Sequence, residues 1–378
     1  MKKSIFLMLV ISLMLAACTS SNSQPTPKMP ATQVPKAVST TLLPTPNSLS
    51  GRLDYYIQTE KPNFSGTILV VRKDEILINK GYGLANQEWG IPNTPQTKFA
   101  IGSLTKSFTG MAILLLQEQG QLSVDDSICQ YLSDCPDAWQ PITLYHLLNH
   151  TSGIYNMELS AQELRETNIC REYKPEEVIA SFKKFLMFEP GKRFYYSNSG
   201  YFLLGYVIEK VTGLSYEEFI QENILIPLDM SESGYDRSSA IVKQRASGYS
   251  LSKSFQVANA DCEDVSLKYA AGGLYSTVGD LHKWVKALNS GQLVPKKTLD
   301  KVFKSAVPAP NGAYANGWFI SQHLDHLVIL HTGGVYGFAA YLAHYPEQNV
   351  TVIVLSNYER EDPSSIGMKL ARLVFDGK

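Results

Sequence analysis

Residues 103–120 read SLTKSFTGMAILLLQEQG. After its first turn the stretch is almost continuously apolar and ends at Gly120, which predicts a buried helix stopped by a glycine. Ser103 and Lys106 are three positions apart and therefore share one face of that helix. Gly102, directly before Ser103, permits a sharp turn from a strand into the helix.

This pair has the chemistry of a nucleophile and its base. A serine hydroxyl attacks a carbonyl efficiently only when a neighbouring base takes its proton. A lysine in an apolar cleft can be that base, because desolvation disfavours the ammonium and lowers its pKa. The helix start also directs free backbone N–H groups at a developing negative charge. The Ser-x-x-Lys spacing recurs at 181–184 and 250–253, so it gains weight at Ser103 only through Gly102 and the apolar helix.

A second motif, Tyr196-Ser197-Asn198, precedes an apolar helical stretch at 202–211. A phenol and a carboxamide two residues apart in a turn can both point into one cleft, and a nearby ammonium lowers the pKa of a phenol. We therefore predict that Tyr196 shares the role of base. The alternative is a core tyrosine followed by a turn asparagine, because Tyr-x-Asn also occurs at 314–316.

A third motif, His331-Thr332-Gly333-Gly334, ends an alternating strand at 327–330. Paired glycines let a substrate backbone approach a strand edge closely. Such an edge can supply an N–H group to an oxyanion hole. The alternative is an ordinary hairpin turn.

In this order the three motifs resemble those of the serine β-lactamase-like proteins, in particular the branch of class C β-lactamases, D-alanyl-D-alanine carboxypeptidases and related esterases. The segments 81–86, 147–154 and 271–277 are similar in the same way, and the resemblance covers roughly residues 50–375. It implies an α/β (α+β) fold: an antiparallel sheet flanked by helices, plus an inserted all-helical subdomain. All three motifs are then expected to meet in one cleft.

The resemblance also implies roles for individual residues. Ser103 is expected to form an acyl-enzyme, while Lys106 and Tyr196 share the proton transfers. Asn198 is expected to orient Lys106 and to bind a substrate amide. The backbone N–H groups of Ser103 and Gly334 are expected to form the oxyanion hole.

His331 departs from the commonest pattern, because β-lactamases of this family usually carry a lysine there. With a reference pKa near 6.5, a histidine is mostly neutral at pH 7 and attracts a substrate carboxylate less. His331, Thr332 and Gly333 are still expected to line the substrate site. The difference favours peptidase or esterase activity over β-lactam hydrolysis.

The N-terminus predicts export. Lys2 and Lys3 precede an apolar run at 5–15, and Leu15-Ala16-Ala17-Cys18 resembles a bacterial lipobox. We read 1–17 as a lipoprotein signal peptide and Cys18 as the lipidated residue; the alternative is an ordinary signal peptide with an incidental cysteine. The predicted location is the cell envelope, with Thr19 favouring the outer membrane in a Gram-negative cell. The only expected membrane contact is this lipid anchor.

The remaining chain divides into a tether and one enzyme domain. Residues 18–48 are rich in Ser, Thr and Pro and predict a disordered tether that reaches about 30 Å if flexible. Residues 49–378 form the hydrolase domain, with the helical subdomain at about 122–265. We expect strands at 66–72, 75–81, 317–323, 327–331, 339–344 and 350–355, and helices at 49–59 and 363–375.

Composition limits the partners. The 378 residues are 44% apolar and 11% aromatic, ample for a core, and the net charge of −1 excludes a nucleic-acid-binding role. Cys129 and Cys135 enclose a short loop and are the best disulfide candidates, while pairing of Cys170 with Cys262 stays open.

No metal or cofactor is expected. His146 and His150 have helical i, i+4 spacing, but the glutamate of an HExxH zinc motif is absent, so both predict structural roles. The sequence therefore predicts an exported serine hydrolase that acts through an acyl-enzyme on a D-amino-acid peptide of cell-wall type, peptidoglycan included, or on a small ester. The alternatives are a class C-type β-lactamase and a catalytically silent penicillin-binding or cell-wall binding module.

Overall fold

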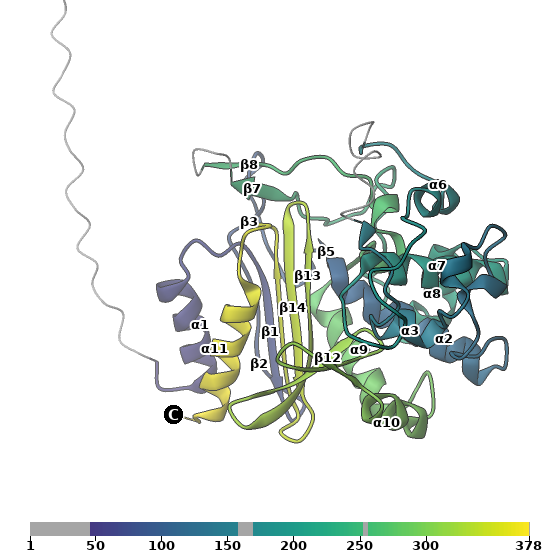
Figure 1. The fold of residues 1–378 in the computed structure, drawn as a ribbon. Coiled ribbons are helices and arrows are strands. Elements are labelled where there is room, and N and C mark those ends of the chain that lie inside the picture. Colours follow the sequence, from purple (N-terminus) through teal and green to yellow (C-terminus); the bar gives the residue numbers. More distant parts are fainter. Residues whose placement is uncertain (1–45, 158–168, 252–255, 378) are drawn as a thin grey trace, which may run out of the picture. The chain divides into compact units, whose positions relative to one another are not determined.

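An antiparallel sheet organises the computed structural model, which describes residues 46–157, 169–251 and 256–377 (Figure 1). The predicted signal peptide, Cys18 and nearly all of the tether lie outside these residues. Eight strands pair in the order β10-β11-β12-β13-β14-β15-β1-β2. Their bounds are Val307–Ala309, Gly312–Ala315, Trp318–His323, His326–Val335, Phe338–Tyr345, Val350–Ser356, Gly66–Arg72 and Glu75–Tyr82.

The first and the last strand of the chain pair with each other, next to the β2 edge of this sheet. Strand β15 reads VTVIVLS and is buried throughout, and β1 reads GTILVVR. They pair from Gly66 opposite Ser356 to Arg72 opposite Val350. Such Val- and Ile-rich strands suit a sheet that is covered on both faces. The predicted antiparallel sheet, built from terminal strands and flanked by helices, is confirmed.

Helices cover both faces of the sheet. On one face lie α1 (Leu49–Glu60) and α11 (Pro363–Phe375), which pack on each other and close one apolar core (Figure 1). On the other face α9 (Val278–Ser290) contacts β15 and β1. A second and larger apolar core extends from this face into the helical region.

Helix α2 (Thr105–Glu118) is the centre of that larger core. Every residue of α2 from Thr105 to Leu116 is buried, as its apolar sequence requires. Phe108 stacks on Trp284 of α9 with ring centroids 4.2 Å apart. On its other side α2 packs against α7 (Asn198–Thr212) and α8 (Tyr216–Ile220). The helix therefore joins the sheet to the helical region.

The helical region is more mixed than the sequence indicates. It contains α3 (Leu144–Leu148) and α6 (Pro175–Ala180), but also the short strands β6 (Gly234–Tyr235), β7 (Tyr249–Leu251) and β8 (Val257–Asn259). The structure joins Cys129 to Cys135 and Cys170 to Cys262 by disulfides. Within the described residues, no helix has the length and apolarity needed to cross a membrane.

Strand β13 is longer than expected, and its length rules out the alternative of a hairpin turn at Gly333 and Gly334. It continues through Gly333 and Gly334 to Val335 and pairs with β14 along this length, so these glycines do not form a hairpin turn. The turn comes later, where Gly337 has a left-handed φ of 79°. The two glycines therefore lie at a strand position, as a substrate-binding edge requires.

Candidate active site

The backbone conformation at Gly102 places Ser103. Strand β5 (Phe99–Ala100) leads into a 3-10 turn at Gly102–Leu104, and α2 follows at once. Gly102 has a φ of +51°, a region that residues with a Cβ rarely adopt. A Cβ there would also lie 2.7 Å from the backbone N of Gly334. Glycine is therefore needed both for the turn and for the close approach of β13.

Lys106 is buried beside the nucleophile candidate. Its side chain is inaccessible to solvent, whereas Ser103 is partly exposed. The amine donates to Ser103 Oγ at 2.9 Å and to the carbonyl of Ala271 at 2.7 Å. The carbonyl fixes the direction of the amine, which leaves it aimed at the serine hydroxyl. Removal from bulk water is the setting in which a lysine can act as a proton acceptor.

Tyr196 completes a group of three. Lys106 Nζ lies 5.0 Å from the centre of the Tyr196 ring and 5.7 Å from that of Tyr201. Tyr196 is partly exposed. Ser103, Lys106 and Tyr196 therefore meet, although the tyrosine comes from a loop before α7.

Asn198 lies at the start of α7. Its backbone N–H donates to Asn156 Oδ1 at 3.0 Å, and the residue lines the same cavity as Ser103 and Gly334. Asn198 therefore lies at the cavity beside Ser103, and its role toward Lys106 and a substrate amide stays a prediction.

His331 is buried and neutral. Its ring centroid lies 6.2 Å from that of Tyr196, and only 1% of the residue is exposed. Burial, and secondly the positive charge of Lys106, lower the pKa of His331 to about 3. Nδ1 lies 2.6 Å from the carbonyl oxygen of Thr332, which can only accept, so this nitrogen holds the proton. His331 therefore brings no positive charge to the cleft at pH 7.

Backbone atoms of β13 pack directly on the turn that carries Ser103. A Cβ at Gly333 would overlap the carbonyl oxygen of Ile101, so this contact admits no side chain. A Cβ at Gly334, in contrast, would meet nothing within 4 Å. The open side of Gly334 leaves room for a substrate, and its N–H and that of Ser103 belong to adjacent segments. The predicted oxyanion hole fits this arrangement, with Thr332 exposed beside it.

The opposite wall of the cleft contains residues that the motifs do not reveal. Glu263, Lys268 and Met157 line the cavity together with Ser103. Lys268 Nζ and Glu263 Oε2 form an ion pair at 3.0 Å. Single charged residues in a loop have no distinctive spacing, so the sequence offers no signal for this pair.

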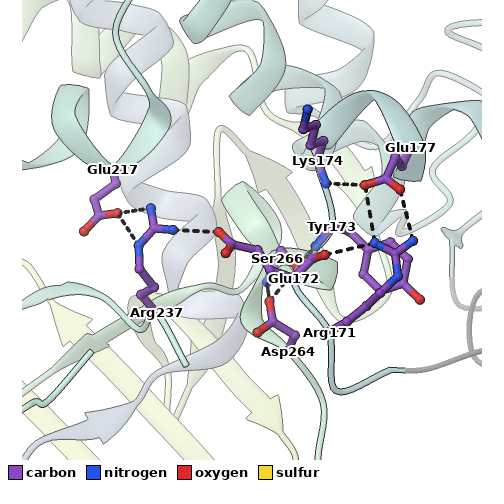
Figure 2. Close-up of polar contacts among 9 residues, drawn as sticks. All are labelled: Arg171, Glu172, Tyr173, Lys174, Glu177, Glu217, Arg237, Asp264 and Ser266. Carbon is purple, nitrogen blue, oxygen red and sulfur yellow. Dashed lines mark hydrogen bonds and ion pairs between the residues drawn. The ribbon is translucent and has the colours of Figure 1, made fainter. Parts of the chain in front are cut away.

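A neighbouring segment anchors this wall (Figure 2). The disulfide between Cys170 and Cys262 joins the segment before α6 to the segment that carries Glu263 and Lys268. Between the same two segments, Tyr173 N–H donates to Ser266 Oγ at 2.9 Å. Ser266 Oγ in turn donates to Asp264 Oδ1 at 2.6 Å. The segment that carries Glu263 and Lys268 is thus held directly before Glu263 and again between the two residues of the ion pair.

Figure 2 also shows how Arg237 extends this anchoring. Its guanidinium contacts Glu172 Oε1 at 2.6 Å and Glu217 Oε2 at 2.7 Å, which ties the 171–177 segment to helix α8. Within the residues that the structure describes, no group of three His, Cys, Asp or Glu side chains is placed to hold a metal ion.

A helix-start serine, a buried lysine aimed at it and an adjoining tyrosine lie together on this framework of sheet and helices, which is the β-lactamase/transpeptidase fold. The chain belongs to the Beta-lactamase family, whose model matches residues 59–375. The resemblance read from the three motifs is thereby confirmed.

Curated relatives are longer than this chain. PbpX of Bacillus subtilis (strain 168), named after penicillin-binding proteins, is 33% identical over 258 residues, which are 68% of this chain and 62% of PbpX. Protein flp of Staphylococcus aureus (strain COL) is 31% identical over 315 residues, covering 78% of this chain and 60% of flp. The chain therefore spans about 60% of the length of these relatives.

Solved structures share the fold. An octameric penicillin-binding protein homologue from Pyrococcus abyssi is 33% identical with a TM-score of 0.77, covering 87% of this chain and 77% of the homologue. A D-amino acid amidase from Ochrobactrum anthropi SV3 has a TM-score of 0.76 and covers 87% of this chain and 98% of the amidase. At 22% identity the amidase shows the shared fold alone.

Proposed function

We propose that this protein hydrolyses a D-amino-acid peptide of cell-wall type, or a small ester, through an acyl-enzyme on Ser103. The observation that carries the proposal is the 2.9 Å contact between Ser103 Oγ and the buried amine of Lys106, with Tyr196 beside that amine. A hydroxyl next to a positioned base is the arrangement that nucleophilic catalysis needs.

The reaction proceeds in two halves. Once Lys106 has given up its own proton and is the neutral amine, it accepts the proton of Ser103 as Oγ attacks the substrate carbonyl. The N–H groups of Ser103 and Gly334 stabilise the oxyanion. The bond to the leaving group then breaks, and Lys106 and Tyr196 return the proton to the departing nitrogen or oxygen. In the second half water attacks the acyl carbon and the same residues take its proton. The ester bond to Ser103 Oγ then breaks, Oγ regains a proton and the acid leaves.

The neutral state of His331 supports a peptide or ester over a β-lactam. A β-lactamase of this family uses a fixed cation there, whereas burial holds the pKa of His331 at about 3. The proposal of a cell-wall type substrate draws on PbpX, which is named a putative penicillin-binding protein, while the D-amino acid amidases share the fold alone. A class C-type β-lactamase is the second candidate, favoured by the family match alone.

Covalent labelling tests the nucleophile. A fluorescent fluorophosphonate is expected to label the wild-type protein and to leave Ser103→Ala unlabelled. Turnover of a D-alanyl-D-alanine peptide, a D-amino acid amide, a p-nitrophenyl ester and nitrocefin then ranks the substrates, and nitrocefin is expected to be the poorest. Equal labelling of both proteins would refute the assignment. Peptidoglycan binding without any turnover, unchanged in Ser103→Ala, would instead favour a silent binding module.

Export and anchoring through Cys18 form a separate part of the proposal. It rests on the sequence at 1–18. In the native host, Cys18→Ala is expected to abolish incorporation of a radiolabelled fatty acid and to move the protein from the membrane fraction to the soluble one. Fatty-acid incorporation that persists in Cys18→Ala would contradict the anchor.

A further inference from the structure

His150 lies directly behind Tyr196, outside the three motifs. It follows α3, has a left-handed φ of +57°, and is only 1% exposed. Its ring centroid is 4.3 Å from that of Tyr196, 4.6 Å from that of Tyr314 and 5.1 Å from that of Tyr201. The ring therefore forms the back of the pocket in which Tyr196 is held.

His150 also binds the backbone on both sides of Tyr196. The N–H of Tyr195 donates to the carbonyl of His150 at 2.8 Å, and the N–H of Ser197 donates to His150 Nδ1 at 3.1 Å. Because these two N–H groups flank Tyr196, a single residue fixes the chain just before and just after the tyrosine. The next residue, Thr151, continues this contact by accepting the N–H of Gly191 at 2.8 Å.

The contact to Ser197 requires a neutral imidazole. Nδ1 accepts from a backbone N–H, so it carries a lone pair and the proton lies on Nε2. Burial, followed by the positive charge of Lys106, lowers the pKa of His150 well below its usual value. The ring consequently stays an acceptor at neutral pH, and the left-handed backbone at His150 directs both of its acceptors to the tyrosine segment.

We propose that His150 is a positioning residue, which sets the phenol of Tyr196 against Lys106 and Ser103 without touching the substrate. This inference rests on the proposed function. Its physical basis is that proton transfer depends steeply on distance, so that a displacement of about 1 Å costs on the order of 100-fold in rate.

Two substitutions separate positioning from packing. His150→Phe retains an aromatic ring in the pocket but removes the Nδ1 acceptor. His150→Asn gives up the ring but keeps a side-chain oxygen that can accept the N–H of Ser197, and asparagine tolerates a left-handed φ. If His150 acts by packing, His150→Phe is expected to retain more turnover than His150→Asn. If His150 acts by positioning, His150→Asn is expected to retain more.

A matched control comes from a second buried histidine. His344 on β14 is 6% exposed, and its Nδ1 lies 3.0 Å from Thr351 Oγ1. It does not line the cleft next to Ser103. His344 Nε2 also lies 2.9 Å from Asn289 Nδ2, so His344→Phe loses side-chain contacts of a buried histidine away from the proposed site.

The experiment measures kcat, KM and the melting temperature of the full chain with a p-nitrophenyl ester. His150→Phe is expected to lower kcat about 10- to 100-fold with KM changed by less than about 3-fold. His150→Asn is expected to regain at least a tenth of wild-type kcat, and His344→Phe to keep kcat within about 2-fold while its melting temperature falls.

Two results would overturn the inference: wild-type kcat in a folded His150→Phe, or a lower kcat in His150→Asn than in His150→Phe. Ser103→Ala, measured in parallel, separates the two proposals. If Ser103→Ala retains turnover, the proposed function fails; if it is inactive while His150→Phe is fully active, only the role of His150 fails.

Discussion

The eight-stranded sheet and the helical region at about 122–265 hold their shape by different means. In the sheet, β1, β14 and β15 pair in unbroken register, and long apolar side chains fill both faces. In the helical region the large apolar core is supplemented by contacts of single residues: the Cys170–Cys262 disulfide, the ion pairs of Arg237 and the backbone contacts of His150. The proposed reaction needs groups from both regions: the backbone of Gly334 from the sheet and Tyr196 from the helical region. Helix α2 lies between the two regions.

The two sides of the candidate site are expected to differ in how easily a substitution displaces them. The sheet contributes a backbone edge, at Gly333 and Gly334, whose position depends on many strand contacts at once. The helical region contributes Tyr196, whose position depends on a few hydrogen bonds. Single substitutions are therefore expected to displace the tyrosine more easily than the strand edge.

Removal of Lys106, the proposed base on helix α2, is expected to have the largest effect on activity. Lys106→Met should reduce kcat/KM for an ester by about 1,000-fold, because it removes the proton acceptor of Ser103. Its melting temperature should remain unchanged or rise, since methionine fills a similar volume without a buried amine. Steady-state kinetics and calorimetry check both statements. A variant with more than a tenth of wild-type kcat/KM would exclude Lys106 as the base.

Disturbing the contact of the strand edge with the nucleophile turn should come next. Gly102→Ala must adopt a φ of +51° and places a Cβ 2.7 Å from Gly334 N, whereas Gly120→Ala has a φ of +69° with nothing within 4 Å. Both should lose about 1 kcal/mol or more of unfolding free energy from backbone strain. Only Gly102→Ala should also lose activity, about 10-fold or more. Equal activities in the two variants would show that the close approach is unimportant.

Acid should weaken the structure through the buried histidines. A neutral buried His331 binds a proton in the native state only near pH 3, whereas the unfolded chain binds one below about pH 6.5. The unfolded state therefore holds more protons in this window, and stability falls as pH drops below about 6.5. By pH 5 the loss from this group should reach about 2 kcal/mol.

Urea unfolding at several pH values measures this loss, with His331→Gln as the comparison. The variant lacks the titrating ring and should show a flatter pH dependence between about pH 5 and 7. Identical slopes for the variant and the wild type would mean that His331 does not titrate as its burial requires.

The smallest effect is expected at the charged wall. Lys268→Met breaks the ion pair with Glu263 inside the cleft, so an anionic acyl group should bind less well, with KM raised about 3-fold. Binding of a neutral ester and kcat should change little. Lys297→Met, at an exposed position of helix α10 (Lys296–Lys304), serves as the charge-matched control. An equal change in KM for neutral and anionic substrates would contradict a role in charge selection.

The sequence predicted the sheet better than the cleft wall, for physical reasons. Strands such as 350–355 and the last helix have strong periodic patterns, and the structure places them within one or two residues of the expected bounds. The continuation of β13 through Gly333 and Gly334 was not expected, because glycine disfavours strands and only the contact with Ile101 and Gly102 explains their presence there.

The candidate site likewise contains residues that the sequence pattern reveals and residues that it does not. Ser103, Lys106, Tyr196 and His331 were found because reactive side chains at fixed spacing leave a pattern. Glu263 and Lys268 could not be found, since their partnership is created by a fold that brings residues together without any spacing rule. The assigned roles remain predictions until the variants are measured.

Any side chain at Gly333 would overlap the carbonyl oxygen of Ile101, and this overlap limits how the protein can evolve. At Gly333 the strand is main chain packed on main chain, so no side chain can be introduced there. New preferences for one acyl group over another are expected at exchangeable side chains such as Lys268 on the facing wall, which the disulfide keeps in place.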